Sequence, residues 1–192
     1  MSTKKKIFLG ILFVAVIAGA YKIYDVYFNY RFLEISENKV YKSGVIPPDK
    51  IEDYVKKYHI KSIVDLRGPV TQDKINNPEN WVQINAEKDA ASKIEGLNYF
   101  NIPSDQVPEP ENLKKFYAVM DNKDNYPVLI HCYHGIGRAQ IYSALYRIEY
   151  EGFSNEEARK NAAFPVMFSS FDDGTPKGEF LKSYVSRKDS VK

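Results

Sequence analysis

The stretch PVLIHCYHGIGRAQIYSALY covers residues 127–146 and joins two patterns of different period. VLIH at 128–131 is a short apolar run that follows a proline, which is typical of a buried strand. RAQIYSALYRIEYEG at 138–152 has apolar residues at helical spacing and ends in Gly152, which indicates a helix with its C-terminal stop. The stretch therefore predicts a strand, a tight loop and a helix, and α/β proteins bind their ligands at such a junction.

The chain alternates strand-like and helix-like patterns from about residue 38 onward. Short apolar runs predict two further strands, at 62–66 and 97–102. Apolar residues recur at helical spacing elsewhere, and Ser154 with Glu157 forms a capping-box pattern. This alternation predicts a single α/β domain with a central, largely parallel sheet flanked by helices and preceded by an N-terminal apolar segment. The additional helices are predicted at 49–59, 86–94 and 111–120, and after Ser154.

The N-terminal segment has the pattern of an export signal. Three lysines at 4–6 precede an uncharged apolar run at 7–21, and the AGA at 18–20 is an A-x-A cleavage pattern. Apolar residues further on extend the run, so residues 7–28 also fit an uncleaved membrane anchor. We therefore expect residues 1–29 to be a signal peptide or a membrane anchor. The rest of the chain is then exported, either periplasmic or anchored to the membrane by its N-terminus.

The composition excludes several other classes of site. The chain has 192 residues, one cysteine and three histidines, and a formal net charge of +2. A single cysteine excludes an intramolecular disulfide and any multi-cysteine metal site. The Lys and Arg residues are scattered, so no nucleic-acid surface is expected. We also expect neither a metal nor another cofactor.

The only cysteine and two of the three histidines fall within residues 131–134, where the predicted strand ends and the loop begins. Five residues separate Cys132 from Arg138, and two of these, Gly135 and Gly137, are glycines. A loop this short can curl so that its backbone N–H groups converge, and with the helix N-terminus it forms an anion site. The same positive field stabilises a thiolate, and the Arg138 guanidinium can hold two phosphate oxygens. We infer that Cys132 is a nucleophile directed at a bound phosphate.

The succession His-Cys-x5-Arg between a strand and a helix resembles the signature of the cysteine-based protein phosphatases. Over most of residues 38–165 the chain resembles the compact dual-specificity-type phosphatases, especially exported bacterial ones. The resemblance implies that residues 30–192 form a cysteine-dependent phosphatase domain. Such a protein-tyrosine or dual-specificity phosphatase hydrolyses phosphomonoesters through a phosphocysteine intermediate. Besides the loop, the similar segments are NKVYKSG at 38–44, IVDLRGP at 63–69, GLNYFNIPSD at 96–105 and ALYRIEYEGFSNEEA at 144–158.

The resemblance also implies a role for each residue of the motif. Cys132 attacks phosphorus, and Arg138 binds the phosphoryl oxygens and stabilises the transition state. Asp105, in NIPSD, matches the family's general acid, which protonates the leaving oxygen. His131 orders the loop and stabilises the thiolate. Backbone N–H groups bind the phosphate, and they belong to Tyr133, His134, Gly135, Ile136, Gly137 and Arg138.

Ala139 departs from the family's pattern, in which a Ser or Thr usually follows the Arg and helps the thiolate to leave. Slow turnover is therefore expected, and a phosphate-binding pseudophosphatase that captures a phosphorylated partner is an alternative. The loop carries Tyr133, His134 and Ile136, whereas lipid-phosphate and inositol-phosphate specialists often carry Lys or Arg there. The expected partner is a phosphorylated protein, with phosphotyrosine favoured, or a small phosphomonoester. A phosphoinositide or inositol-phosphate phosphatase is the second alternative.

Overall fold

The centre of the molecule is a five-stranded sheet. In the computed structural model, residues 2–69, 74–75, 77–164 and 168–189 are described. The strands are β1 (Leu33–Ser36), β2 (Val40–Ser43), β3 (Ser62–Asp65), β4 (Asn98–Asn101) and β5 (Val128–His131). Their order is β1-β2-β5-β3-β4, and β5 lies in the middle, parallel to β2 and β3. β4 is parallel to β3, and β1 is antiparallel to β2, so the predicted largely parallel sheet is confirmed.

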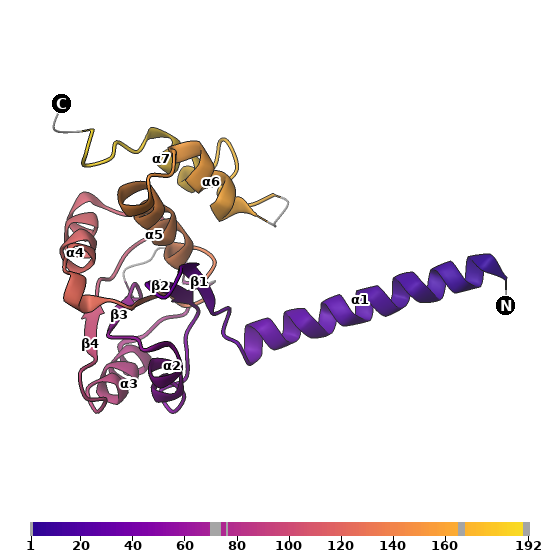
Figure 1. The fold of residues 1–192 in the computed structure, drawn as a ribbon, viewed down its shortest axis with the longest axis horizontal. Helices are drawn as coiled ribbons and strands as arrows, with labels where there is room; N and C mark the ends of the chain where they lie inside the picture. The colour runs from indigo at the N-terminus through magenta and orange to yellow at the C-terminus, as the bar shows by residue number, and fades with distance from the viewer. Residues whose placement is uncertain (1, 70–73, 76, 165–167, 190–192) are drawn as a thin grey trace.

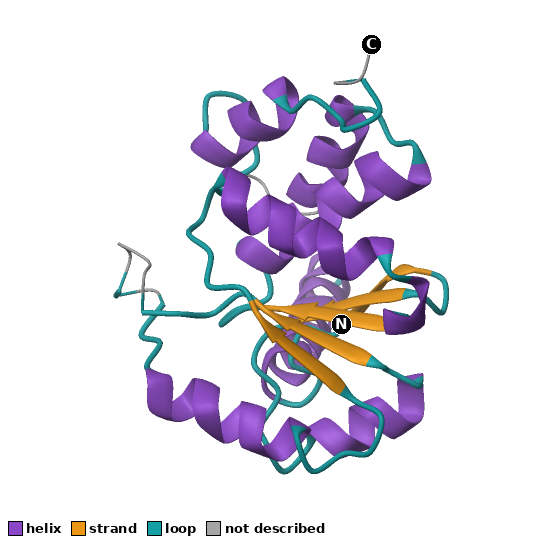
Figure 2. Ribbon diagram, turned by 90° about the vertical axis from the view of Figure 1, so that its left-hand side faces the viewer, coloured by secondary structure: helices purple, strands orange, loops and turns teal. Residues whose placement is uncertain are grey.

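Helices cover both faces of the sheet, as Figures 1 and 2 show. One face carries α2 (Ile51–Tyr58) and α3 (Trp81–Ala91). The opposite face carries α4 (Pro110–Asp121) and α5 (Arg138–Tyr146), and α6 (Asn155–Ala163) and α7 (Pro176–Ser183) pack against α5. Short turns of 3₁₀-helix at Lys123–Asn125 and of π-helix at Arg147–Glu151 follow α4 and α5. The predicted single α/β domain is therefore confirmed.

Alternate residues of the strands point to opposite faces, and each face has its own apolar cluster. On β5, Val128 and Ile130 pack in the cluster that contains α4 and α5. Leu129 packs in the other cluster, with α2. Because all four residues of β5 are buried, the strand reads as a continuous apolar run in the sequence. Burial on both faces fixes β5 and therefore the start of the loop that follows it.

The helix ends that follow the loop are as the sequence predicts. α5 begins at Arg138, and its π-helical extension ends at Gly152, whose φ of +76° is the left-handed conformation of a helix stop. Ser154 caps α6, because its Oγ accepts a hydrogen bond from the N–H of Glu157 at 3.2 Å. The segment between the loop and α6 is thus fixed by local signals.

Two helices differ from the prediction. The helix predicted at 86–94 begins earlier and ends earlier, at Trp81–Ala91. Its buried face contains Ile84, Glu87 and Ala91, and a charged residue in that face hides the apolar period on which the prediction depended. α7 was not predicted, because it is short and contains Gly178, a poor helix former.

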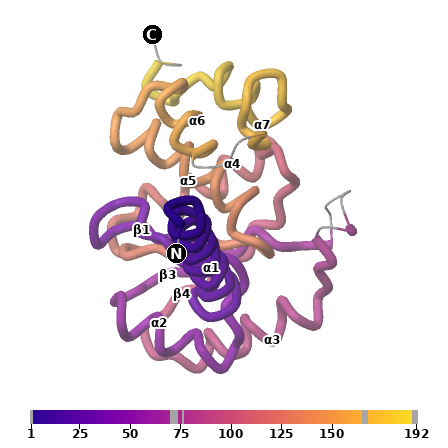
Figure 3. The backbone as a smooth tube through the Cα atoms, turned by 90° about the vertical axis from the view of Figure 1, so that its right-hand side faces the viewer, coloured from indigo at the N-terminus to yellow at the C-terminus, as the bar shows by residue number. Residues whose placement is uncertain are grey.

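α1 (Thr3–Tyr27) is a continuous helix that projects from the domain (Figures 1 and 3). None of its residues is buried, and the apolar side chains of Ile11, Phe13 and Val14 are each about two thirds exposed, at 65%, 67% and 65%. By length and composition it can cross a membrane. A helix of this size is roughly 37 Å long, compared with about 30 Å for the hydrocarbon core of a bilayer. The predicted N-terminal apolar segment is therefore present as one helix.

Candidate active site

Cys132 directly follows β5 and begins a loop that ends at α5; we refer to residues 132–138 as the 132–138 loop. The cysteine side chain is buried, and its Sγ accepts hydrogen bonds from the N–H groups of Gly135 (3.3 Å) and Ala139 (3.5 Å). One donor belongs to the loop and the other to the first turn of α5, so both direct positive charge at the same sulfur. These two hydrogen bonds fix the position of the sulfur relative to the loop and to α5. The structure thus places Cys132 where a nucleophile is predicted.

Gly135 is required by the conformation and the packing of the loop. Its φ is +74°, in the left-handed region that favours glycine. A Cβ atom at this position would lie 2.4 Å from the backbone N of Gly44 and 2.6 Å from the carbonyl carbon of Ser43. The loop therefore passes directly over the end of β2, with no room for a side chain between the two backbones.

Arg138 is fully buried at the first position of α5. Its Nη1 donates to the carbonyl oxygen of Leu66 (2.9 Å) and to Oε2 of Glu79 (3.0 Å). Its Nη2 donates to Oδ1 of Asn77 (3.1 Å) and to Oε1 of Glu79. Among the described residues, Nε of Arg138 has no hydrogen-bond partner. The guanidinium that is predicted to hold two phosphate oxygens is thus bonded to Glu79 here, and Nε is its uncommitted donor.

The pKa of Arg138 follows from this contact. Burial by itself lowers the pKa of the guanidinium, but the hydrogen bond to Glu79 and the neighbouring Cys132 outweigh it, and the net shift is upward. The side chain therefore keeps its positive charge although water does not reach it. A buried charge of this kind is tolerated only with a well-placed partner, which Glu79 provides.

His131 belongs to a buried charge network formed with Asp65, Arg67 and Glu87. Arg67 donates to Asp65 from Nε (2.9 Å) and Nη2 (2.8 Å), and its Nη2 also donates to Glu87. The Nε2 of His131 lies 2.8 Å from Oε1 of Glu87 and 3.6 Å from Oδ1 of Asp65. The contact between His131 and Glu87 is therefore an ion pair, and it does not have the geometry of a hydrogen bond. The network joins the ends of β3 and β5 to α3.

The pKa shifts of His131 and Asp65 favour the charged form of each side chain. Burial by itself lowers the pKa of His131, but the carboxylates of Glu87 and Asp65 outweigh it and raise the pKa above its ordinary value. Burial by itself raises the pKa of Asp65, but the charges of His131 and Arg67 hold it below its ordinary value. Asp65, Glu87 and His131 offer ligand atoms within 4.8 Å of one another, as a metal site does. Because Arg67 already bonds both carboxylates, the residues fit an internal ion-pair network better than a metal site.

Cys132 opens into a cavity of about 260 Å³. The lining contains Gln106, whereas Asp105, the predicted general acid, is on the same loop but not in the lining. Oδ1 of Asp105 accepts a hydrogen bond from the N–H of Gln106 at 2.7 Å. The other lining residues are Asn77, His134, Ile136, Gly137, Arg138, Ser170 and Lys177. The structure therefore brings Cys132 and Arg138 together and places Asp105 beside their cavity.

Several residues of the site could not be found from the sequence. Asn77 and Glu79 reach Arg138 from 61 and 59 positions away, out of a polar stretch with no apolar period. Glu87 reaches His131 from α3, and Lys177 enters the cavity from α7. The one local signal is at Gln106, because it directly follows the predicted acid in NIPSDQ.

Three solved structures share the fold of this chain. The first is the core catalytic domain of the PP-IP phosphatase Siw14 from S. cerevisiae in complex with citrate, with 20% identity, a TM-score of 0.57, and coverage of 80% of this chain and 85% of that one. The second is TpbA from P. aeruginosa, with 15% identity, a TM-score of 0.58, and coverage of 82% and 86%. The third is a cysteine-to-serine variant of TpbA in complex with pTyr, with 16% identity, a TM-score of 0.54, and coverage of 80% and 89%.

Residues 30–173 match the family described as DSP-PTPase phosphatase fused to NAD+ kinase, and the chain belongs to this family. Among curated proteins, none matches the chain. At the identities given above, the solved structures establish likeness of fold, and the family match establishes the class. The prediction of a cysteine-dependent phosphatase is therefore confirmed.

Proposed function

We propose that the chain hydrolyses phosphomonoesters in two steps through Cys132. In the first step Sγ attacks phosphorus, the bond to the leaving oxygen breaks, and a phosphocysteine forms. In the second step water attacks phosphorus, the S–P bond breaks, and phosphate and the thiolate are released. The observation that carries this proposal is the convergence of two N–H groups, from Gly135 and Ala139, on Sγ of Cys132.

Arg138 supplies the side-chain charge for the transition state. Its Nε, without a partner in the described part of the chain, donates to a phosphoryl oxygen together with the loop N–H groups of residues 133–138. Fixed donors of this kind stabilise developing negative charge because they need no reorganisation. Glu79 acts on Arg138 as a positioning residue, since it bonds both Nη atoms and holds the guanidinium plane in one orientation. His131 orders the start of the loop from the strand side through its contact with Glu87 in the buried network.

We assign the general acid to Asp105, on the loop after β4. The side chain is half-buried, and its backbone neighbour Gln106 lines the cavity. Protonation of the leaving oxygen then requires the Asp105 carboxyl to turn toward the cavity by a change within this loop. A protonated carboxyl gives its proton to the oxygen as the P–O bond breaks, so no alkoxide is released into the site.

Phosphotyrosine is the substrate that the cavity rim favours. His134 and Ile136 line the cavity, and Ile136 is 55% exposed, so the rim offers apolar and aromatic contacts for a phenyl ring. The cavity is slightly below the usual size of small-molecule sites, which suits one phosphoryl group on one ring. The pTyr complex of the TpbA variant supports the same choice.

An inositol phosphate is the second candidate, and Lys177 favours it. This lysine lines the cavity, and its Nζ would lie 3.2 Å from a Cβ atom placed on Gly137. A cation at this distance from the loop suits a second phosphate group beside the one attacked. The likeness of fold to the PP-IP phosphatase Siw14 points in the same direction.

We further propose that α1 holds the domain at a membrane on the exported side. Its exposed apolar surface is continuous over Ile7–Ile17 and beyond, and a surface of this extent needs a cover. The helix runs without a break through the AGA at 18–20. A reporter enzyme that is active only outside the cytoplasm, fused after residue 192, should give signal in the membrane fraction. An exclusively cytoplasmic reporter would overturn the export proposal, and a shortened chain in the soluble fraction would overturn the anchor.

The substrate proposal is tested by phosphate release from three substrates, a phosphotyrosine peptide, a phosphoserine peptide and an inositol polyphosphate. The full-length chain in detergent should prefer the phosphotyrosine peptide, and Cys132→Ser should abolish release from all three. Lys177→Met separates the two candidates. It should lower kcat/KM for the inositol polyphosphate, whose second phosphate group Lys177 would bind. It should leave kcat/KM for the phosphotyrosine peptide nearly unchanged. Equal release by Cys132→Ser would contradict the two-step mechanism itself.

The role of Asp105 is tested by the leaving group. Asp105→Asn should slow formation of the intermediate by about 10²- to 10⁴-fold for a substrate with a poor leaving group, and much less for one with a good leaving group. Gln106→Ala serves as the control, because the Gln106 carboxamide is not ionisable and cannot act as a general acid. Equal slowing of both substrates by Asp105→Asn would assign the acid elsewhere.

A further inference from the structure

Three successive carbonyl groups of the 132–138 loop accept hydrogen bonds from residues 31–45. The carbonyl oxygen of Tyr133 accepts from the backbone N–H of Val45 at 3.1 Å. The carbonyl oxygen of His134 accepts from Nη1 of Arg31 at 2.7 Å. The carbonyl oxygen of Gly135 accepts from Nζ of Lys42 at 3.0 Å. The loop is therefore held from outside by one backbone donor and two cationic side chains.

These contacts determine where the loop directs its N–H groups. In a trans peptide the C=O of one residue and the N–H of the next point in opposite directions. The carbonyl of His134 points to Arg31, and the N–H of Gly135 on the same peptide accordingly donates to Sγ of Cys132 at 3.3 Å. By the same geometry, the bond from Lys42 to the carbonyl of Gly135 turns the N–H of Ile136 away from Lys42, toward the anion side of the loop.

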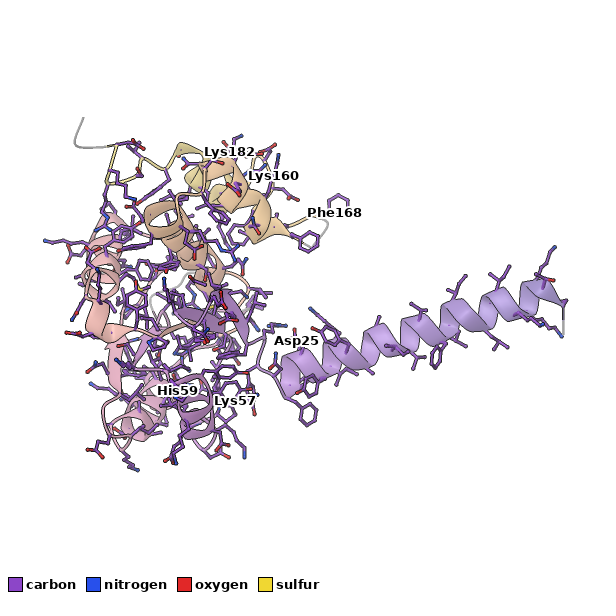
Figure 4. The ribbon with its side chains drawn as sticks, viewed as in Figure 1. Asp25, Lys57, His59, Lys160, Phe168 and Lys182 are labelled. Atoms are coloured by element: carbon purple, nitrogen blue, oxygen red, sulfur yellow. The ribbon has the colours of Figure 1, made fainter. Side chains whose placement is uncertain are left out.

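Lys42 is an unusual residue for its place in the fold. It lies on β2, in the interior of the sheet, and is only 6% exposed. Removing an ammonium group from water is costly unless its donors are bonded, and here it is bonded to the carbonyl of Gly135. Arg31 is half-buried in the connection between α1 and β1. Its backbone N–H donates to the carbonyl oxygen of Asp25 at 2.7 Å, and Figure 4 shows Asp25 where α1 meets the domain.

We propose that Lys42 and Arg31 are positioning residues for the phosphatase reaction, which orient two successive peptides of the 132–138 loop and place positive charge beside the Cys132 thiolate. The inference rests on the proposed function, because it assigns how the anion site of that function is built. Neither side chain touches the phosphate. Each acts through a carbonyl group of the loop. The peptide held by Arg31 donates its N–H to Sγ of Cys132, and the peptide held by Lys42 directs its N–H toward the anion side of the loop.

The charge of Lys42 depends on pH in the range of ordinary measurement. Burial lowers its pKa to about 8, against the raising effects of Cys132 and Asp25 and with a further lowering effect of Arg31. These are the charged groups that face it from the loop, from α1 and from the connection to β1. The ammonium form therefore predominates below pH of about 8 and is lost above it.

The experiment measures how inorganic phosphate protects Cys132 from alkylation by iodoacetamide. Cys132 is the only cysteine, so alkylation of the full-length chain reports this site alone. Lys42→Met and Arg31→Met should each weaken phosphate protection by about 10- to 100-fold, the range for loss of one charge-assisted hydrogen bond. They should also slow alkylation of the free protein at a fixed pH. Lys39→Met, which removes an exposed lysine of the same hairpin, should match wild type in both measurements.

Lys42→Arg provides a readout that a purely structural role would not move. In wild type, phosphate protection should weaken as the pH rises through about 8, because Lys42 loses its charge. In Lys42→Arg the charge persists, so protection should continue to higher pH. Lys42→Arg keeps the buried cation, so the comparison with wild type tests the role of Lys42 even if Lys42→Met does not fold.

Two results would overturn the inference. One is folded Lys42→Met and Arg31→Met proteins that bind phosphate and react with iodoacetamide as wild type does. The other is a Lys42→Arg pH profile identical to that of wild type. Failure of the proposed function is distinguishable from both, because then phosphate would not protect Cys132 in the wild-type chain at all.

Discussion

The 132–138 loop and the segment 77–87 contribute to the same site with opposite chemistry. The loop contributes backbone N–H groups, and through Arg138 a buried positive charge, to the place where an anion binds. The segment 77–87 contributes two buried carboxylates, of Glu79 and Glu87, and they bond the cations around that place. The buried anion site of this protein thus depends on carboxylates that pair with its cations as well as on the N–H groups that face the anion. Without the two carboxylates, the cations that serve the phosphate would be buried without partners.

The largest expected effect comes from removing one of these acids. Glu79→Gln leaves the buried charge of Arg138 without its partner, so the free energy of unfolding should fall by about 3–5 kcal/mol, measured by urea denaturation. Inorganic phosphate should then stabilise the variant more than it stabilises wild type, because the anion replaces the lost charge. Glu111→Gln is the matched control, since Glu111 forms an exposed pair with Lys115 that contributes about 0–1 kcal/mol. A Glu79→Gln protein as stable as this control would refute the role of the carboxylate.

The next effect concerns the backbone of the loop. Gly135→Ala and Gly152→Ala both place a side chain at positive φ, at +74° and +76°, which costs about 1–2 kcal/mol. Only Gly135 has backbone atoms within contact distance, so its variant should lose about 1–3 kcal/mol more and should also lose phosphate binding. Thermal unfolding with and without phosphate measures both. Equal losses in the two variants would mean that the loop tolerates a side chain at residue 135.

A pH dependence should follow from the network of the second acid, Glu87. The pKa of His131 is raised in the folded state, so its stabilisation is fully present below the unfolded value and is lost as the pH rises through the folded value. The pKa of Asp65 is lowered, so its stabilisation is lost at the acid end, as the pH falls through its folded value. Glu87→Gln should move the alkaline loss of stability to lower pH in urea denaturation. His59→Gln removes an exposed histidine and should leave the profile unchanged; a change there equal to that of Glu87→Gln would count against the network.

The smallest effect is expected at Ala139, where the loop joins α5. Its N–H already donates to Sγ of Cys132, but the residue has no hydroxyl to help the sulfur leave. Rapid mixing should show a burst of leaving group followed by slower turnover, and Ala139→Ser should raise the steady rate severalfold with the burst rate nearly unchanged. If wild type shows no burst and Ala139→Ser shows no gain, hydrolysis of the intermediate is not the slow step.

The two segments also differ in how far they can be predicted from sequence. The 132–138 loop depends on local features, namely a buried strand before it, glycines within it and a helix after it, and these are visible as periods and spacing. Gly135 and Cys132 could therefore be assigned before the fold was known. The raised pKa of Arg138, in contrast, arises in part from its hydrogen bond with Glu79, which lies 59 positions away in the sequence.

Long-range side-chain contacts leave no such trace. Glu87 occupies a core-facing position of α3, where the helical pattern leads one to expect an apolar residue. This charged residue is the reason that the predicted bounds of the helix differ from the observed ones. Arg31 and Lys42 are single cations among 27 Lys and Arg residues, and only the fold shows that they reach successive carbonyls. The sequence thus predicts the nucleophile and the phosphate cradle, while the residues that orient them become visible only in three dimensions.

In the proposed reaction, Cys132 carries the phosphoryl group during turnover. The most direct measurement is an acid quench of the full-length chain during hydrolysis of an aryl phosphate, within the time of the first turnover, followed by mass spectrometry of its peptides. The peptide containing Cys132 should gain the mass of one phosphoryl group, and Cys132→Ser should show neither turnover nor this intermediate. Turnover by wild type with an unmodified Cys132 peptide at every quench time, or with the phosphoryl group on another residue, would contradict the proposed reaction.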